Sequence, residues 1–302
     1  MADLEGARVG VIGGSGLYSI PGLSQVEERA ISTPFGAPSD QLRLGELEGV
    51  ETVFLARHGR HHQLLPSEVP YRANIWAMRS LGVRWLISLS AVGSLQGHLH
   101  PRDMVVPDQF IDRTRQRPSS FFGNGCVAHV SLAEPFCPQL SALLADAAEK
   151  GLPKGQKLHR GGTYLCMEGP AFSTQAESKL YRSWGCSVIG MTNHTEARLA
   201  REAELAYASL SMVTDFDCWH EDHDAVSVEM VISNLQANAS ATEPILSGLM
   251  QQLKQKPPAS TAHTALANAL ITPKDQVPAE TRSKLDLFTS PYWGSFDQSS
   301  IS

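Results

Sequence analysis

Short apolar runs alternate with amphipathic segments along most of the chain. Apolar runs typical of buried strands lie at residues 8–14, 51–57, 84–90, 161–169, 186–191 and 206–215. Segments with helical spacing lie at residues 71–82, 176–185, 195–204 and 226–253, the last with Pro244 as a candidate break. This alternation predicts an α/β fold, a single domain built on a mixed central β-sheet flanked by helices.

Two regions depart from this alternation. Residues 108–137 are rich in Arg, Pro, Phe and Gly and are long for a connection, which indicates a functional or interface segment. After residue 255 the sequence is polar and weakly patterned, with a short helix expected at most near residues 261–270. We therefore predict a main domain over residues 1–255 and a C-terminal tail over residues 256–302 that is weakly structured or forms a short helix.

Composition narrows the class of protein. The 302 residues are 42% hydrophobic and 19% charged, which is ample for a large core, and the net charge of -6 gives no attraction toward nucleic acid or an anionic membrane. No apolar run reaches the ~18 residues of a membrane helix, and the N-terminus lacks the apolar segment of a secretion signal. The five cysteines include no CxxC pair. We therefore expect a cytoplasmic protein with reduced thiols, no membrane contact and no nucleic-acid partner.

Residues suited to an oxyanion follow three of the predicted strands. Ligands of open α/β sheets bind at the carboxyl ends of the strands. Those ends carry a glycine turn with Ser15, then Arg57 with His58, and then the small residues Ser90–Ser94. The turn GGSG (13–16) lacks the third glycine of a dinucleotide fingerprint, and the GK[ST] of a P-loop is also missing. A plain turn and a surface basic cluster are the alternatives for the first two ends, whereas one anion site would use all three.

The stretch TDFDCWHEDHD (214–224) is rich in metal-ligand residue types but lacks metal-ligand spacing. It contains neither H-E-x-x-H nor the glycine at the sixth position of a calcium loop. We predict no metal site, and a solvated acidic turn over residues 221–224. Asp215 and Asp217 alternate at the end of a strand and therefore face the same side. These two carboxylates are the candidates for binding a ligand.

Phe172 follows a Gly-Pro turn at another strand end, in MEGPAF (167–172). An aromatic residue is more often part of a core than part of a site. At this position, however, the ring can stack on a flat or apolar ligand. Both interpretations stay open on the residues alone.

Seven stretches together resemble the trimeric nucleoside phosphorylases, and most of all the members of that family that act on 5'-methylthioadenosine. The resemblance covers residues 9 to about 235. It is carried by IGGSGLY (12–18), TPFGAPSD (33–40), FLARHGRHHQLLPSEVPYRANIWAM (54–78), DQFIDRT (108–114), AEPFCP (133–138), MEGPAFSTQAES (167–178) and TDFDCW (214–219).

The resemblance implies a nucleoside phosphorylase-like catalytic domain over residues 1–255. It also implies a role for individual residues of the active site. Phosphate would be bound by Ser15, Arg57, His58, Ser90, Ala91 and Thr192. The nucleoside would contact Phe172, Ser173, Met191, Asp215 and Asp217, and its methylthio group would enter a recess made by Val228, Val231 and Ile232. His129 would come from a neighbouring subunit of a homotrimer, which would explain the long segment 108–137.

The implied chemistry is phosphorolysis of an N-glycosidic bond. Phosphate is the nucleophile, so the site needs no metal and no organic cofactor, and inorganic phosphate is a co-substrate. The protein must place phosphate under C1' of the ribose and donate a proton toward N7 of the purine. Asp217 is the candidate acid, because burial can raise a carboxyl pKa enough for it to hold a proton. Asp215 would accept from a 6-amino group and so favour adenine.

The implied reaction converts 5'-methylthioadenosine and phosphate to adenine and 5-methylthioribose 1-phosphate. The nearest alternative is the same reaction on 5'-methylthioinosine or another purine nucleoside. Alternatives from other classes are a dinucleotide-dependent oxidoreductase, disfavoured by the incomplete glycine fingerprint, and a nucleoside-binding module without turnover.

The chain departs from the family pattern at Asn193–Thr195. An apolar residue and a proline commonly precede Glu196 in the family, and this chain has Asn-His-Thr instead. We expect His194 to be a partly exposed loop residue, with a ligand contact as the alternative. Ser15 and Ser90 stand where threonine is common, which keeps the hydroxyl.

Overall fold

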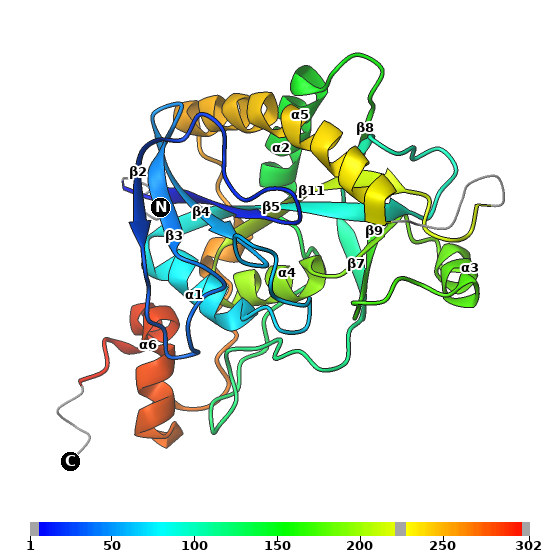
Figure 1. Ribbon diagram of the computed structural model, residues 1–302. Helices are drawn as coiled ribbons and strands as arrows, with labels where there is room; N and C mark the ends of the chain where they lie inside the picture. The colour runs from blue at the N-terminus through cyan, green and yellow to red at the C-terminus, as the bar shows by residue number, and fades with distance from the viewer. Residues whose placement is uncertain (1–5, 221–227, 298–302) are drawn as a thin grey trace.

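A mixed sheet of 11 strands forms the centre of the protein, in a computed structural model that describes residues 6–220 and 228–297 (Figure 1). The strands are β1 (Arg8–Gly13), β2 (Ser24–Arg29), β3 (Leu42–Leu47), β4 (Val50–Ala56), β5 (Val83–Ser94), β6 (Met104–Val106), β7 (Gln109–Arg113), β8 (Leu158–Arg160), β9 (Thr163–Met167), β10 (Val188–Gly190) and β11 (Ala206–Asp215). The helices are α1 (Tyr71–Ser80), α2 (Pro138–Gly151), α3 (Gln175–Ser183), α4 (Asn193–Glu202), α5 (Val228–Gln255) and α6 (Ala279–Trp293), with short 3-10 helices at Thr261–Thr264 and Lys274–Gln276. The predicted α/β fold with a mixed central sheet is confirmed.

The sheet is organised around its longest strand, β5. This strand pairs in parallel with β1 on one side and with β11 on the other, and its last residues pair antiparallel with β10. Gly93 of β5 is opposite Ile189 of β10 and also opposite Asp215 of β11. The carboxyl ends of β10 and β11 therefore reach the same point on β5, although the two strands arrive from opposite directions.

Helices cover both faces of this sheet (Figure 1). The helices α2 and α5 pack on one face, and α1 and α4 pack on the other. The apolar residues of α2, such as Leu140 and Leu144, recur at helical spacing, so this helix buries one stripe against the strands. Pro244, the candidate break, lies inside α5, which continues to Gln255.

The segment 108–137 is mostly irregular, as its composition predicts. It begins with β7, which pairs in parallel with β9, and then continues as a loop that packs near α6. His129 is exposed in this loop. None of the helices in the described ranges is both long and apolar enough to cross a bilayer.

Residues 256–297 contain a long helix, where the sequence predicted a tail that is weakly structured or forms a short helix. The helix α6 has 15 residues, and its Leu285 and Phe288 are each 1% exposed. Phe288 packs against Phe121 with ring centroids 4.5 Å apart, within the same apolar core that α1 and α4 share. The expected short helix near residues 261–270 corresponds to the 3-10 helix Thr261–Thr264. The helix α6 was not expected, because the apolar residues of this region follow no clear period in the sequence although several of them are buried.

Replacing Phe288 with alanine should destabilise the protein. Removal of a buried phenylalanine side chain costs about 3–5 kcal/mol of unfolding free energy. Thermal or chemical unfolding of Phe288→Ala against the unaltered protein measures this cost. Lys284→Ala on the same helix is the matched control, since its side chain is 42% exposed and its ion pair with Glu280 is a surface pair. Equal stability of the two variants would show that α6 does not belong to the core.

Candidate active site

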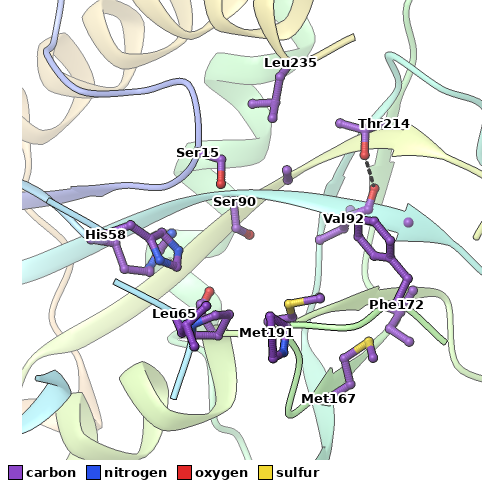
Figure 2. A pocket seen from close by; sticks show the side chains of 18 of the residues that line it. Ser15, His58, Leu65, Ser90, Val92, Met167, Phe172, Met191, Thr214 and Leu235 are labelled. Carbon is purple, nitrogen blue, oxygen red and sulfur yellow. Dashed lines mark hydrogen bonds between the residues drawn. The ribbon is translucent and has the colours of Figure 1, made fainter. Parts of the chain in front are cut away.

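One cavity of about 310 Å³ lies where the carboxyl ends of six strands meet. It is bounded by residues that end or follow β1, β4, β5, β9, β10 and β11. Figure 2 shows Ser15, His58 and Ser90 toward one end of the cavity and Met167 and Phe172 toward the other. The cavity gathers these predicted site residues: Ser15, Arg57, His58, Ser90, Ala91, Phe172, Met191, Thr192, Asp215 and Asp217.

Arg57 is fixed by a buried ion pair with Glu196 of α4. The Arg57 side chain is 1% exposed, and its Nε and Nη2 donate to the two oxygens of the Glu196 carboxylate, the second contact at 3.1 Å. Nη2 also donates to the Ser88 hydroxyl at 2.6 Å, and Nη1 donates to the Leu89 carbonyl at 3.2 Å. Burial alone would lower the pKa of Arg57, but the adjacent Glu196 carboxylate outweighs burial and raises that pKa above its ordinary value. Arg57 is therefore a permanent cation.

Most of the donors that would make Arg57 suited to an oxyanion are already used within the protein. A guanidinium carries five N–H groups. Glu196, Ser88 and Leu89 take four of them, so within the described part of the chain a single N–H of Nη1 has no partner. Arg57 can thus offer a bound anion one hydrogen bond from a fixed position.

The glycine turn after β1 makes room for Arg57. A Cβ at Gly14 would lie 2.6 Å from Nη1 of Arg57 and 2.8 Å from the Leu89 carbonyl oxygen, both too close for a side chain. The Gly14 N–H itself donates to the Leu89 carbonyl at 2.9 Å. Ser15, the next residue, lines the cavity. The turn therefore brings backbone and a hydroxyl beside the guanidinium.

His58 is a neutral ring at this end of the cavity. Its Nδ1 lies 2.8 Å from the Leu64 carbonyl, which only accepts hydrogen bonds, so this nitrogen carries the proton. Burial and then the charge of Arg57 lower the pKa of His58 to about 4. Positive charge near an anion at neutral pH thus comes from Arg57, and His58 contributes hydrogen bonding.

A buried hydroxyl at the same end is available to a ligand. Ser90 is 3% exposed and lines the cavity, and its Oγ makes no hydrogen bond with any residue that the structure describes. Leaving a buried hydroxyl without a partner costs about 1–3 kcal/mol. A ligand oxygen at this position would remove that cost. Thr192, also a cavity residue, lies at the N-terminus of α4.

Asp215 and Asp217 form the other functional end. Asp215 accepts from the Thr214 hydroxyl at 2.7 Å and from the Asp217 backbone N–H at 2.7 Å, so its orientation is fixed. Burial raises the pKa of Asp215, against these two hydrogen bonds that favour its ionised form. Burial also raises the pKa of Asp217, against the neighbouring serine hydroxyls of α3 and its N-terminal loop. Two carboxyls with raised pKa values thus face one cavity.

Gly93 allows these carboxyls to approach β5. A Cβ at this position would lie 2.9 Å from Oδ1 of Asp215, 3.1 Å from the Ile189 side chain and 3.5 Å from Cβ of Asp217. The left-handed backbone of Asp217, with φ of 51°, turns the chain at the strand end. Asp215 and Asp217 were predicted to face the same side. They can do so because the neighbouring strand has a glycine, Gly93, at this point.

Phe172 lies at the rim and is 47% exposed, so the core interpretation of this ring is wrong. Ser173, its neighbour, does not line the cavity. The Ser173 hydroxyl donates to the Met167 sulfur at 3.9 Å, and its carbonyl accepts from the Cys218 thiol at 3.2 Å. Cys218 and the other four cysteines have free thiols.

Other predicted residues lie elsewhere. His129 is exposed and does not line the cavity of this chain. Val228, Val231 and Ile232 belong to the first turns of α5, but their side chains lie outside the described part of the structure. The acidic turn over residues 221–224 also lies outside it.

The cavity also includes residues that the sequence did not single out one by one. Residues 62–66 form one wall, and Met167, Ile189 and Leu235 contribute apolar surface. The stretch 54–78 that resembles the family contains the wall at 62–66, so that signal was present. No sequence motif predicts Leu235 as a cavity residue, because it reaches the cavity only through the packing of α5 near Gly16.

His194 is buried, which corrects the prediction of a partly exposed loop residue. It is 3% exposed in the first turn of α4, and its ring packs edge-on against Phe110 at 4.8 Å between centroids. Its Nδ1 lies 3.3 Å from Oδ1 of Asp112. Burial lowers the pKa of His194 to about 4, although Asp112 opposes this. The ring does not line the cavity, so it is not a ligand contact either.

No metal centre is formed within residues 6–220 and 228–297. In that part of the chain no group of three or more His, Cys, Asp or Glu side chains is arranged to hold an ion.

The chain is similar to known proteins over most of its length. The family model described as Phosphorylase superfamily matches residues 8–251. A protein of Prochlorococcus marinus named S-methyl-5'-thioadenosine phosphorylase is 63% identical, over 98% of this chain and 94% of that protein. A protein of Geobacter sulfurreducens with the same name is 53% identical, over 94% of this chain and 98% of that protein.

Solved structures agree as well. A methylthioadenosine phosphorylase from an antarctic soil metagenomic library has a TM-score of 0.89 and 51% identity, and covers 93% of this chain and 98% of its own. A methylthioadenosine phosphorylase of Schistosoma mansoni in complex with adenine has a TM-score of 0.79 and 38% identity, and covers 83% of this chain and 93% of its own. The nucleoside phosphorylase-like fold is thereby confirmed, and the chain belongs to the phosphorylase superfamily.

Proposed function

We propose that this protein cleaves 5'-methylthioadenosine with inorganic phosphate, giving adenine and 5-methylthioribose 1-phosphate. The observation that carries the proposal is one cavity with a fixed arginine N–H at one end and two buried carboxyls at the other. Phosphorolysis needs both, because an anion attacks C1' on one side of the sugar while the purine leaves on the other. The names of relatives with 53% and 63% identity support the same substrate.

The first end binds phosphate. Arg57 and Glu196 together carry no net charge, so hydrogen bonds from fixed donors supply most of the binding. One N–H of Arg57 and the hydroxyl of Ser90, which have no partner among the residues that the structure describes, are two such donors. Ser15, His58, Ala91 and Thr192 complete this end of the cavity. Donors positioned in advance lower the barrier, since they need no rearrangement as phosphate attacks.

The second end binds and protonates the purine. Asp217 acts as the general acid toward N7, because its raised pKa lets the carboxyl hold a proton in the buried site. Asp215, held by Thr214 and by the Asp217 backbone, accepts from the 6-amino group of adenine. Phe172 at the rim stacks on the base, and Met191 contacts the ribose, with Ser173 supporting the loop.

The 5' end of the nucleoside lies toward helix α5, and the protein assembles as a trimer. The start of α5, with Val228, Val231 and Ile232, forms the recess for the methylthio group, and Leu235 extends its apolar wall. The chain forms a cytoplasmic homotrimer in which the exposed His129 reaches a neighbouring site. The reaction uses neither metal nor organic cofactor, because phosphate itself is the nucleophile.

Release of free base from three nucleosides tests the reaction and the substrate. 5'-methylthioadenosine should give adenine only when phosphate is present. 5'-methylthioinosine and inosine should react more slowly by about 10-fold to 100-fold, the effect of a mismatched buried donor and acceptor worth ~1–3 kcal/mol. Base release without phosphate, or faster cleavage of inosine, would contradict the proposal.

Asp217→Asn should lower turnover about 100-fold or more, the scale of a lost general acid, while the fold is retained. The protonated form of Asp217 is the active one, so turnover of the unaltered protein should also fall as pH rises through the raised pKa of this carboxyl. The asparagine variant should lose that pH limb. Asp146→Asn is the control, because Asp146 lies at the surface in an ion pair with Arg160. Unchanged turnover in Asp217→Asn would remove Asp217 from the role of acid.

Asp215→Asn should move the preference from 6-amino toward 6-oxo purines. An amide can donate to a 6-oxo group, which a carboxylate cannot. The ratio of kcat/KM for 5'-methylthioadenosine over 5'-methylthioinosine should fall about 10-fold or more, the scale of one buried hydrogen-bond mismatch. If this ratio does not change, Asp215 does not bind the substituent at position 6 of the purine.

A further inference from the structure

Arg117 is a buried arginine outside the cavity with no role in the chemistry above. It lies in the long segment 108–137, and its side chain is 1% exposed. Its Nη2 donates to the Glu168 carbonyl at 2.6 Å and more weakly to the Met167 carbonyl at 3.4 Å, and its Nη1 donates to the Met191 carbonyl. Its Nε donates to the Glu168 carboxylate at 3.1 Å, and Nη1 also donates to the Tyr71 hydroxyl at 3.2 Å.

These contacts begin where the pairing of β9 with β10 stops. The last residues paired between the two strands are Cys166 and Gly190. The next residues, Met167 and Met191, are cavity residues and are no longer joined by the ladder. Arg117 donates to the carbonyl oxygens of both, so a single planar guanidinium spans the two strand ends.

The arginine is itself held from both sides. The Glu168 carboxylate accepts the backbone N–H groups of Arg115 and Gln116, the latter at 3.3 Å, in addition to Nε of Arg117. The Tyr71 hydroxyl donates in turn to the Pro66 carbonyl at 2.9 Å, and Pro66 lies in the cavity wall formed by residues 62–66. The cluster therefore links three walls of the cavity through rigid contacts.

We propose that Arg117 is a positioning residue that sets the spacing of Met167 and Met191 for the nucleoside. The inference rests on the proposed function for what the cavity binds. Of the phosphate residues, only Thr192 adjoins a residue that Arg117 contacts, because it follows Met191. The others, Ser15, Arg57, His58, Ser90 and Ala91, lie on β5 or directly after β1 and β4, none of which Arg117 contacts. Loss of Arg117 should therefore weaken the binding of nucleoside and leave the binding of phosphate nearly unchanged.

Arg117→Lys tests this with a matched control. Lysine keeps the charge but cannot span two strand ends with a planar group. Arg201 is the control position, because it is also a buried arginine whose Nη atoms donate to two backbone carbonyls, those of Ser131 at 3.1 Å and Glu134, but it does not line the cavity. Both lysine variants should lower the melting temperature, because each loses hydrogen bonds to buried carbonyls.

The kinetic constants separate the two variants. Arg117→Lys should raise KM for 5'-methylthioadenosine about 10-fold, as expected for lost hydrogen bonds to charged groups, with KM for phosphate within about 2-fold. Arg201→Lys should change neither KM. The inference is overturned if Arg117→Lys raises both KM values equally, if it raises neither, or if Arg201→Lys reproduces its effect.

A milder variant and a binding measurement keep the test independent of folding and of turnover. Tyr71→Phe removes only the hydroxyl that connects Arg117 to Pro66, and it should raise KM for nucleoside alone, by about 2-fold to 3-fold, as one lost hydrogen bond predicts. Adenine binding, measured by calorimetry, should weaken about 10-fold in Arg117→Lys for the same reason. If the unaltered protein binds adenine but turns over no nucleoside, the proposed function fails while adenine affinity still decides the role of Arg117.

Discussion

The ion pair between Arg57 and Glu196 is the interaction on which the site depends. It joins the residue after β4 to the helix α4, and Ser88 of β5 and Tyr207 of β11 also bond to the same carboxylate. Removing one member of a buried pair costs about 3–5 kcal/mol, because the other charge is left buried and unpaired. The pair therefore fixes an arginine in the interior and also limits what that arginine can offer a ligand.

The small number of N–H groups that Arg57 has left explains the other residues at the phosphate-binding end of the cavity. With most of its N–H groups occupied, Arg57 cannot bind phosphate alone, and the neutral ring of His58 adds no charge. Small residues and hydroxyls at strand ends must supply the remaining hydrogen bonds. The net charge of -6 likewise gives phosphate no long-range attraction, so binding depends on local geometry.

The sequence predicted those parts of the fold that carry a single strong periodicity. All ten residues of β11 are buried, and its apolar run was recognised. β2 could not be recognised this way, because nearly all of its residues are exposed at the edge of the sheet. The helix α2 was missing from the predicted helices, although its amphipathic pattern and the proline in its first turn are both present in the sequence.

Site residues could be predicted where a strand end or a family motif places them, as for Arg57 and Asp217. The residues that hold them in position could not be predicted. Glu196 is 139 residues from Arg57 in the sequence, and Arg117 is 74 residues from Met191, so no local sequence pattern indicates either contact. Long-range pairing of this kind becomes visible only in the folded chain.

The glycine at position 93 has a consequence for how this enzyme can diversify. Two neighbouring strands converge on it, and any added carbon would push a carboxylate and an isoleucine apart at once. Position 93 is thus closed to any larger residue. New preferences for the base or for the 5' group, whether reached by evolution or by engineering, have to arise at other positions of the cavity, where a side chain can change without displacing two strands at once.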